Sequence, residues 1–153
     1  MSLSCNMTLG HYIWPLRWAV QFIKTDLQVL EADHNSLCQE LLEQLPLGNP
    51  ARQKTDQLKQ YVHVMRRSLE AGELEELEEG ARLDDITPQV AQVEASDMLA
   101  IVLESKADAE RQLITIVRLE PHLQHCWETH QETLQQDWDS VVNSIQKLLE
   151  ELQ

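Results

Sequence analysis

Apolar residues recur along the first third of the chain at alternating intervals of four and three positions. The series consists of Leu16, Val20, Ile23, Leu27, Leu30, Leu37 and Leu41, with His34 in one place of the pattern. This spacing puts every member on one face of an α-helix, whereas a half-buried β-strand would alternate at every second residue. Pro15 suits the first helical position, and the sequence PLGNP at 46–50 is typical of a helix end. The pattern predicts a helix over about residues 15–45, preceded by an N-terminal arm over residues 1–14.

Three further long helices are predicted by the same criteria. The second, about 51–71, ends before Gly72 and has as its inward positions Leu58, Tyr61 or Val62, Met65 and Leu69. Thr87 as the N-cap and Pro88 as the first helical residue open the third helix, about 88–119. Pro121 opens the last helix, about 121–152, and the sequence ELEELEEG at 73–80 is expected to form a short acidic helix in the second connection.

No segment alternates as a strand does, so the sequence predicts an all-α protein. Four long helices with short connections favour an antiparallel up-down four-helix bundle that forms one domain over residues 1–153. The apolar series of the first and last helices match when the numbers of facing residues sum to 164. That register pairs His34 with His130 and Cys38 with Cys126, whereas a slide of one heptad keeps the apolar matches and loses these polar pairs.

The net charge of the chain excludes some classes of binding partner, and its cysteines indicate the cellular compartment. The chain has 26 acidic and 12 basic residues and a formal net charge of −14, which repels phosphate backbones and anionic lipids. We therefore expect neither nucleic acid nor a membrane as partner. The three cysteines, Cys5, Cys38 and Cys126, form no even disulfide set and no CxxC pair, which is typical of a cytoplasmic protein. The first residues contain no basic leader and no uninterrupted apolar span, so we expect no signal peptide and no membrane helix.

The sequence HLQHCWETH at 122–130 holds the densest set of metal-ligand side chains. His122, Cys126 and His130 are spaced by four residues, and the outer two are about 12 Å apart along a helix, so this helix supplies at most two ligands to one ion. The register above makes a zinc-type cluster of four residues conceivable: His34, Cys38, Cys126 and His130. A buried polar layer without metal is the favoured interpretation, so we expect no metal and no cofactor.

The sequence VHVMRRSLEAGELEEL at 62–77 resembles the phosphorylated segment of histidine phosphotransfer (HPt) domains, which are also helical bundles. The resemblance implies a phosphorelay protein in which His63 accepts the phosphoryl group and Arg66 steadies it. It also implies that Met65 is the apolar residue that follows the histidine and that Ser68 is the small residue beyond it. Arg67 stands where the family usually has a glycine.

The sequences EELEE at 75–79 and EASD at 94–97 resemble the EExxE and ExxD signature of all-helical nucleotide pyrophosphohydrolases of the MazG type. In that family clustered carboxylates hold magnesium and activate water. The resemblance implies this role for five residues: Glu75, Glu76, Glu79, Glu94 and Asp97.

Aromatic residues gather near the start of the first helix, where Trp14 and Trp18 are one turn apart and Tyr12 is close by. Aromatic surface that one helix end cannot bury is typical of an association site, so we predict that Tyr12, Trp14 and Trp18 contact a partner.

No nucleophile and base can be paired in the sequence. It therefore favours a non-enzymatic protein that binds another protein, or a second copy of itself as a homodimer. Phosphotransfer through His63 is the first alternative, and MazG-type hydrolysis is the second.

Overall fold

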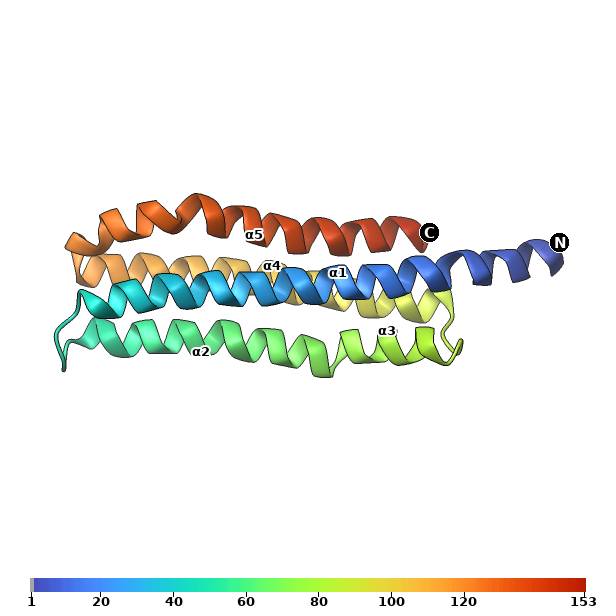
Figure 1. Ribbon diagram of the computed structural model, residues 1–153, viewed down its shortest axis with the longest axis horizontal. Coiled ribbons are helices and arrows are strands. Elements are labelled where there is room, and N and C mark those ends of the chain that lie inside the picture. Colours follow the sequence, from blue (N-terminus) through green and yellow to red (C-terminus); the bar gives the residue numbers. More distant parts are fainter. Residues whose placement is uncertain (1) are drawn as a thin grey trace.

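The computed structural model describes the backbone of residues 2–153 and the side chains of residues 16–153. The described residues form α1 (Ser2–Glu43), α2 (Pro50–Ala71), α3 (Glu73–Arg82), α4 (Pro88–Leu119), the 3-10 helix η1 (Pro121–Leu123) and α5 (Gln124–Glu151) (Figure 1). They contain no strand, so the predicted all-α class is confirmed. None of the helices in this part of the chain is both long enough and apolar enough to cross a lipid bilayer.

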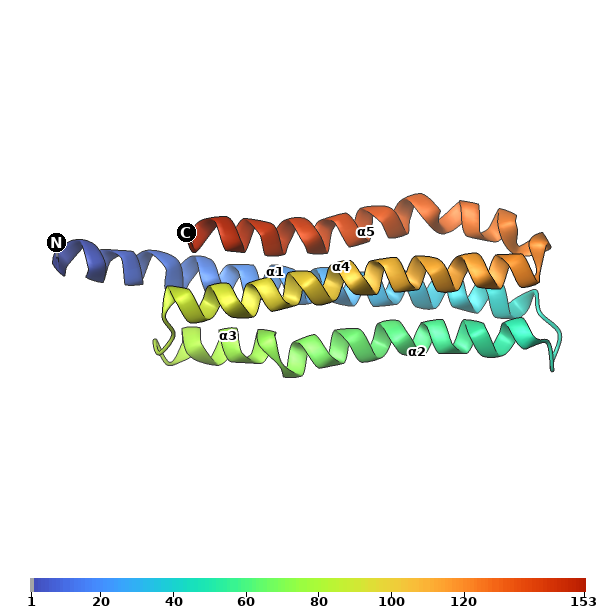
Figure 2. The same cartoon turned by 180° about the vertical axis from the view of Figure 1, so that it is seen from behind.

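The helices lie side by side along the long axis of the molecule. Figures 1 and 2 show α5 on one side, α2 and α3 on the opposite side, and α1 and α4 between them on the two faces. Both α1 and α4 pack against α5, α2 and α3. The colours of Figure 1 show that α1 and α4 run in one direction and that α2, α3 and α5 run in the other. The first turns of α1 extend beyond the end of α5.

The core follows the apolar stripes along the whole molecule. Every member of the predicted α1 series from Leu16 to Leu41 is buried, including His34. The facing stripes are Leu58, Val62, Met65 and Leu69 on α2, and Leu134, Trp138, Val141, Ile145 and Leu148 on α5. Burial of one such side chain contributes about 1.5–3 kcal/mol, so the stripes make a large favourable contribution to the free energy of folding.

Side-chain caps and prolines set several helix ends. The Asn49 side chain accepts a hydrogen bond from the Ala51 N–H at 2.8 Å ahead of α2, and Thr87 accepts one from the Val90 N–H at 3.2 Å ahead of α4. The start of α1 corrects our prediction, because α1 begins at Ser2 and leaves no arm over residues 1–14. Pro15 lies within this helix, where a proline removes one main-chain donor and favours a kink without having to end the helix.

Gly72 separates α2 from α3, and α3 continues in the same direction along α1 and α4. Its buried face consists of Leu74, Leu77 and Ala81. Acidic residues occupy the first turn of α3, where the helix dipole favours negative charge. At Gly80 an added Cβ would lie 2.7 Å from the Cβ of Ile86, so only glycine lets the following loop pack this closely on α3.

The register of α5 on α1 differs from the predicted one. Ser144 donates to Asp26 at 2.7 Å, Asp33 and Asp137 share a hydrogen bond, and His130 Nε2 lies 2.7 Å from Glu40 Oε2. We call these three pairs the α1–α5 polar row. The residue numbers of each pair sum to 170, and successive pairs are one heptad apart, so the predicted sum of 164 is wrong. The observed and predicted registers differ by almost one heptad. The apolar residues of both helices repeat at about that interval, so they pack nearly as well in either register.

Asp137 lies half-buried at the centre of the polar row. Burial, the hydrogen bond with Asp33 and the charges of Asp33 and Asp26 raise the pKa of Asp137 to about 7. Two carboxylates this close are more stable when they share a proton than when both are ionised. Asp137 therefore titrates near neutral pH.

We predict that this pair weakens the fold as the pH rises. The pKa of Asp137 is about 7 in the folded protein against 3.8 for a free side chain, so folding takes up a proton between these values. The stability from this group is fully present below about pH 4 and is lost as the pH rises through about 7. Asp137→Asn should therefore raise the melting temperature more at pH 8 than at pH 5, measured by circular dichroism.

The control for this prediction is Asp139→Asn, which changes an exposed carboxylate on the same helix. It should leave the pH dependence of the melting temperature unchanged. An Asp137→Asn effect of the same size at both pH values would contradict the shared proton.

Candidate functional site

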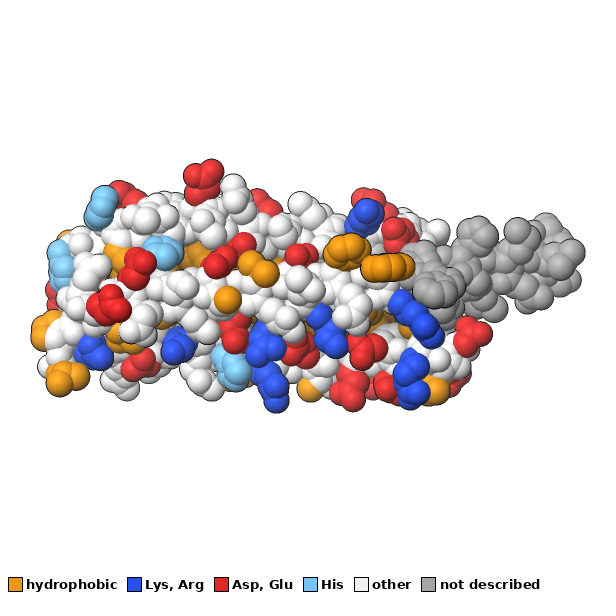
Figure 3. Space-filling model, in the orientation of Figure 1, with side chains coloured by type: hydrophobic (Ala, Val, Ile, Leu, Met, Phe, Trp, Pro, Cys, Tyr) orange, Lys and Arg blue, Asp and Glu red, His pale blue; other side chains and the backbone are white. Residues whose placement is uncertain are grey.

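Two large aromatic side chains on α1 face solvent. Trp18 is 61% exposed and Phe22 is 60% exposed, although residues of these types are usually buried. Their ring centroids are 6.3 Å apart with an angle of 32° between the planes. We call Trp18 and Phe22 the aromatic patch. Figure 3 shows hydrophobic side chains at this end of α1, directly beside the grey N-terminal residues.

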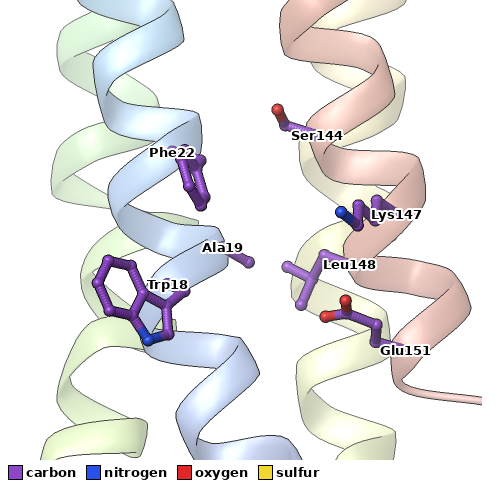
Figure 4. A pocket seen from close by; sticks show the side chains of 7 residues that line it. All are labelled: Trp18, Ala19, Phe22, Ser144, Lys147, Leu148 and Glu151. Carbon is purple, nitrogen blue, oxygen red and sulfur yellow. The ribbon is translucent and has the colours of Figure 1, made fainter.

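A pocket of about 370 Å³ opens beside the aromatic patch, between α1 and α5. Its lining consists of Trp18, Ala19 and Phe22 from α1 and Ser144, Lys147, Leu148 and Glu151 from α5. Figure 4 shows Lys147, Leu148 and Glu151 pointing from α5 toward α1. The buried Leu148 provides an apolar base, while Lys147 and Glu151 place one cation and one anion at the rim. The aromatic patch and this pocket together offer apolar area within a polar border.

The structure describes only part of the predicted contact site. Trp18 is exposed, whereas the side chains of Tyr12 and Trp14 lie outside the described residues. Phe22 was not predicted as a contact residue. Its signal in the sequence is its position, because it stands one turn after Trp18 and outside the buried series of α1.

The histidine and cysteine of α1 do not face their predicted counterparts. His34 is fully buried, donates from Nδ1 to the Leu30 carbonyl at 2.8 Å, and packs edge-on against Trp138 with centroids 5.7 Å apart. The Nε2 atom of His34 is buried without a hydrogen-bond partner. Cys38 is also fully buried, and burial raises the pKa of its thiol to about 12. Both residues therefore belong to the core.

Cys126 and His130 lie instead beside Glu40 of α1. Glu40 Oε2 is 2.7 Å from His130 Nε2 and 3.6 Å from Cys126 Sγ. The His130 side chain is 16% exposed and that of Glu40 is 51% exposed, so the group lies at the surface of the α1–α5 groove. Burial and the Glu40 carboxylate raise the pKa of the Cys126 thiol to about 11. The predicted interior position of His130 beside His34 is wrong, because the register of α5 moves His130 along α1 to Glu40.

His63, the candidate phosphoacceptor, lies on α2 opposite Glu31 of α1. Its Nδ1 is 2.9 Å from Glu31 Oε1, and Arg66 Nε donates to the same oxygen at 2.9 Å. Arg66 also donates to Glu70 at 2.6 Å. Burial favours the neutral form of Glu31, but the hydrogen bonds from Arg66 and His63 outweigh it and lower the pKa of this carboxyl. The His63 side chain remains 43% exposed, so Glu31 orients an accessible imidazole.

Of the five carboxylates implied by the MazG resemblance, Glu76 and Asp97 lie near enough to Glu94 for their charges to act on it. The five do not form a group of three ligand atoms close enough to hold one metal ion. Among the described side chains, the only group of three or more potential ligand atoms within 4.8 Å of one another is Glu40, Cys126 and His130. Glu79 instead pairs with Arg82 at 2.8 Å. Burial and the charges of nearby carboxylates raise the pKa of Glu94. The resemblance is therefore not accompanied by a magnesium-binding geometry in the described residues.

We predict that His34 makes the fold sensitive to acid. Burial lowers the pKa of His34 below its usual 6.5, so the unfolded chain takes up the proton first as the pH falls. Stability that is present above about pH 6.5 is then lost at lower pH. His34→Phe keeps a ring beside Trp138 but takes up no proton, so its melting temperature should fall less than that of its parent between pH 7.5 and 5.5.

This comparison is best made in the Asp137→Asn background, which removes the opposite pH dependence of that carboxyl. His125→Phe, at an exposed position of α5, serves as the control. If the melting temperature falls equally with and without His34→Phe, His34 is not the acid-sensitive group.

Both family resemblances of the sequence are short and rest on local motifs. Three comparisons with known proteins, against family models, curated proteins and solved structures, found no match to the chain.

Proposed function

We propose that this chain is an antiparallel up-down four-helix bundle that acts without catalysis, by binding protein at the aromatic patch. The observation that carries the proposal is the exposure of Trp18 and Phe22 beside an apolar pocket. Complete burial of an aromatic side chain removes about 150–250 Å² from water, and association can remove at most the 61% of Trp18 and the 60% of Phe22 that are still exposed. At about 25 cal/mol per Å² this contributes several kcal/mol, which is typical of the anchor residues of an interface.

The partner that we propose is a second copy of this chain. A twofold-symmetric contact brings one surface against itself, so its charges must complement one another. Lys147 and Glu151 stand one turn apart at the pocket rim, and an antiparallel approach sets Lys147 opposite Glu151 of the partner subunit. The free thiols of Cys38 and Cys126 support a reducing compartment, and we propose the cytoplasm.

The net charge of −14 sets the salt dependence of such a dimer. Two copies repel each other at long range, and salt screens that repulsion while the apolar contact is retained. Self-association should therefore strengthen with ionic strength. Binding to a basic partner would weaken under the same change, which distinguishes the two kinds of occupant.

Sedimentation velocity over a range of protein concentrations tests the proposal. Wild type should shift toward dimer as concentration and salt rise. The double variant Trp18→Ala with Phe22→Ala should weaken dimerisation by more than about tenfold, because truncation of interface anchors typically costs about 2 kcal/mol or more. Circular dichroism should show unchanged helicity, since both side chains are exposed.

Val29→Ala is the matched control, because Val29 is an exposed apolar residue of α1 outside the pocket lining. It should leave the dimerisation constant unchanged. A wild-type chain that remains monomeric at every concentration and salt would contradict self-association.

Phosphotransfer through His63 is a second candidate function, supported by the exposure of its imidazole and by Arg66 nearby. In this reaction a phosphoryl group leaves an aspartyl phosphate of a response regulator and forms a P–N bond with His63. Arg66 is already paired with Glu31 and Glu70, which leaves less of its charge for a phosphate. We therefore place this function second.

Incubation with a panel of phosphorylated response regulators tests this second candidate. Wild type and His125→Gln should become labelled, whereas His63→Gln should not. A complete absence of label across the panel would exclude phosphotransfer as the role of His63.

A further inference from the structure

The group formed by Glu40, Cys126 and His130 combines three kinds of metal-ligand atom. A carboxylate oxygen, a thiol sulfur and an imidazole nitrogen all lie within 4.8 Å of one another. Cys126 and His130 are one turn apart on α5 and therefore project to the same side, toward Glu40 on α1. We propose that these three side chains bind one zinc ion.

The backbone that carries the ligands is held in place by the core. Leu37 and Leu41 are buried on either side of Glu40, and Leu123 and Leu134 are buried on either side of the α5 ligands. These apolar contacts fix the separation of α1 and α5 whether or not an ion is present. The site is thus largely pre-organised, and only side chains need to adjust.

The two distances from Glu40 require one small adjustment. Zinc ligands lie about 2.0–2.3 Å from the ion in a tetrahedron, which separates ligand atoms by about 3.3–3.7 Å. Cys126 Sγ and Glu40 Oε2 are already 3.6 Å apart. His130 Nε2 and Glu40 Oε2 are 2.7 Å apart, the distance of the hydrogen bond that zinc would replace. Because half of the Glu40 side chain is exposed, it is free to retreat by this amount.

Proton balance follows from the ligand types. Zinc binds thiolate, so the Cys126 thiol loses its proton to solvent. A neutral His130 moves its ring proton from Nε2 to Nδ1 and offers the Nε2 lone pair to the ion. Each zinc ion therefore releases one proton. Three protein ligands leave the fourth position of the tetrahedron for water or for a ligand atom of another molecule.

The ligand set also selects the metal. Magnesium and calcium prefer oxygen ligands alone, whereas sulfur and nitrogen ligands favour zinc among the redox-inert divalent ions. Cobalt(II) occupies such sites with similar geometry and reports a thiolate ligand by a charge-transfer band.

Titration of the metal-free full chain with zinc, in competition with a chromophoric chelator, tests the proposal. Wild type should bind one zinc ion per chain, and the variants Cys126→Ser, His130→Gln and Glu40→Gln should each bind at least about tenfold more weakly. Cobalt(II) should give the thiolate band with wild type and lose it with Cys126→Ser. Zinc should also raise the melting temperature of wild type, because it binds the folded chain.

The controls are His125→Gln on the exposed side of α5 and Cys38→Ala in the core, and both should bind zinc as wild type does. Glu40→Gln keeps the test valid if Cys126→Ser is poorly folded, since Glu40 is exposed. Zinc affinity that is the same in wild type and Glu40→Gln, or a cobalt complex without the thiolate band, would overturn the proposal. Retention of zinc by Trp18→Ala with Phe22→Ala would show that the site is independent of the aromatic patch.

Discussion

The packing of α5 against α1 decides where every candidate site lies. The pocket beside the aromatic patch, the contact of His34 with Trp138 and the Glu40 group all lie between these two helices. Apolar stripes press the helices together but tolerate a slide of one heptad, because they repeat at that interval. The polar row removes this freedom. Asp26 receives a hydrogen bond from Ser144, and Glu40 pairs with His130, at 2.7 Å in each case.

The acidic face of α1 explains why the register is unique. Asp26, Asp33 and Glu40 recur at heptad intervals, so Asp137 meets a carboxylate in the observed register and in either neighbouring one. A slide of one heptad in either direction takes the present donor from both Asp26 and Glu40, whereas the observed register gives each of them one. The single acidic pair that remains, Asp33 with Asp137, is accommodated by a shared proton. Polar contacts that are weak individually thus select among arrangements that the apolar core alone would accept.

Features carried by one helix were visible in the sequence, whereas features shared between helices were not. The buried series of α1 and the cap at Thr87 follow from spacing and residue type within one segment. The sequence does not locate the start of α1, because a proline suits the first position of a helix and can also lie inside one. Glu40 and Glu31 were missed because an acidic residue in an acidic chain carries no signal until its partner across the groove is known. The predicted pair of His34 with His130 does not form for a related reason. A hydrogen bond between two imidazoles is weaker than the one that His130 forms with the carboxylate of Glu40.

The two ends of the α1–α5 groove are linked through this register. Zinc at Glu40 and a protein bound at the aromatic patch would each contact both helices, so each would favour the same alignment of α5 on α1. When two ligands favour the same alignment, each raises the binding affinity of the other only to the extent that a different alignment is populated without them. The polar row keeps that population small, which makes the two sites nearly independent while the row is intact. Above about pH 7 Asp137, which lies between the two sites, loses the proton of its hydrogen bond with Asp33. Repulsion at the centre of the row then loosens the alignment, and we expect the coupling between the two ends to be largest under those conditions.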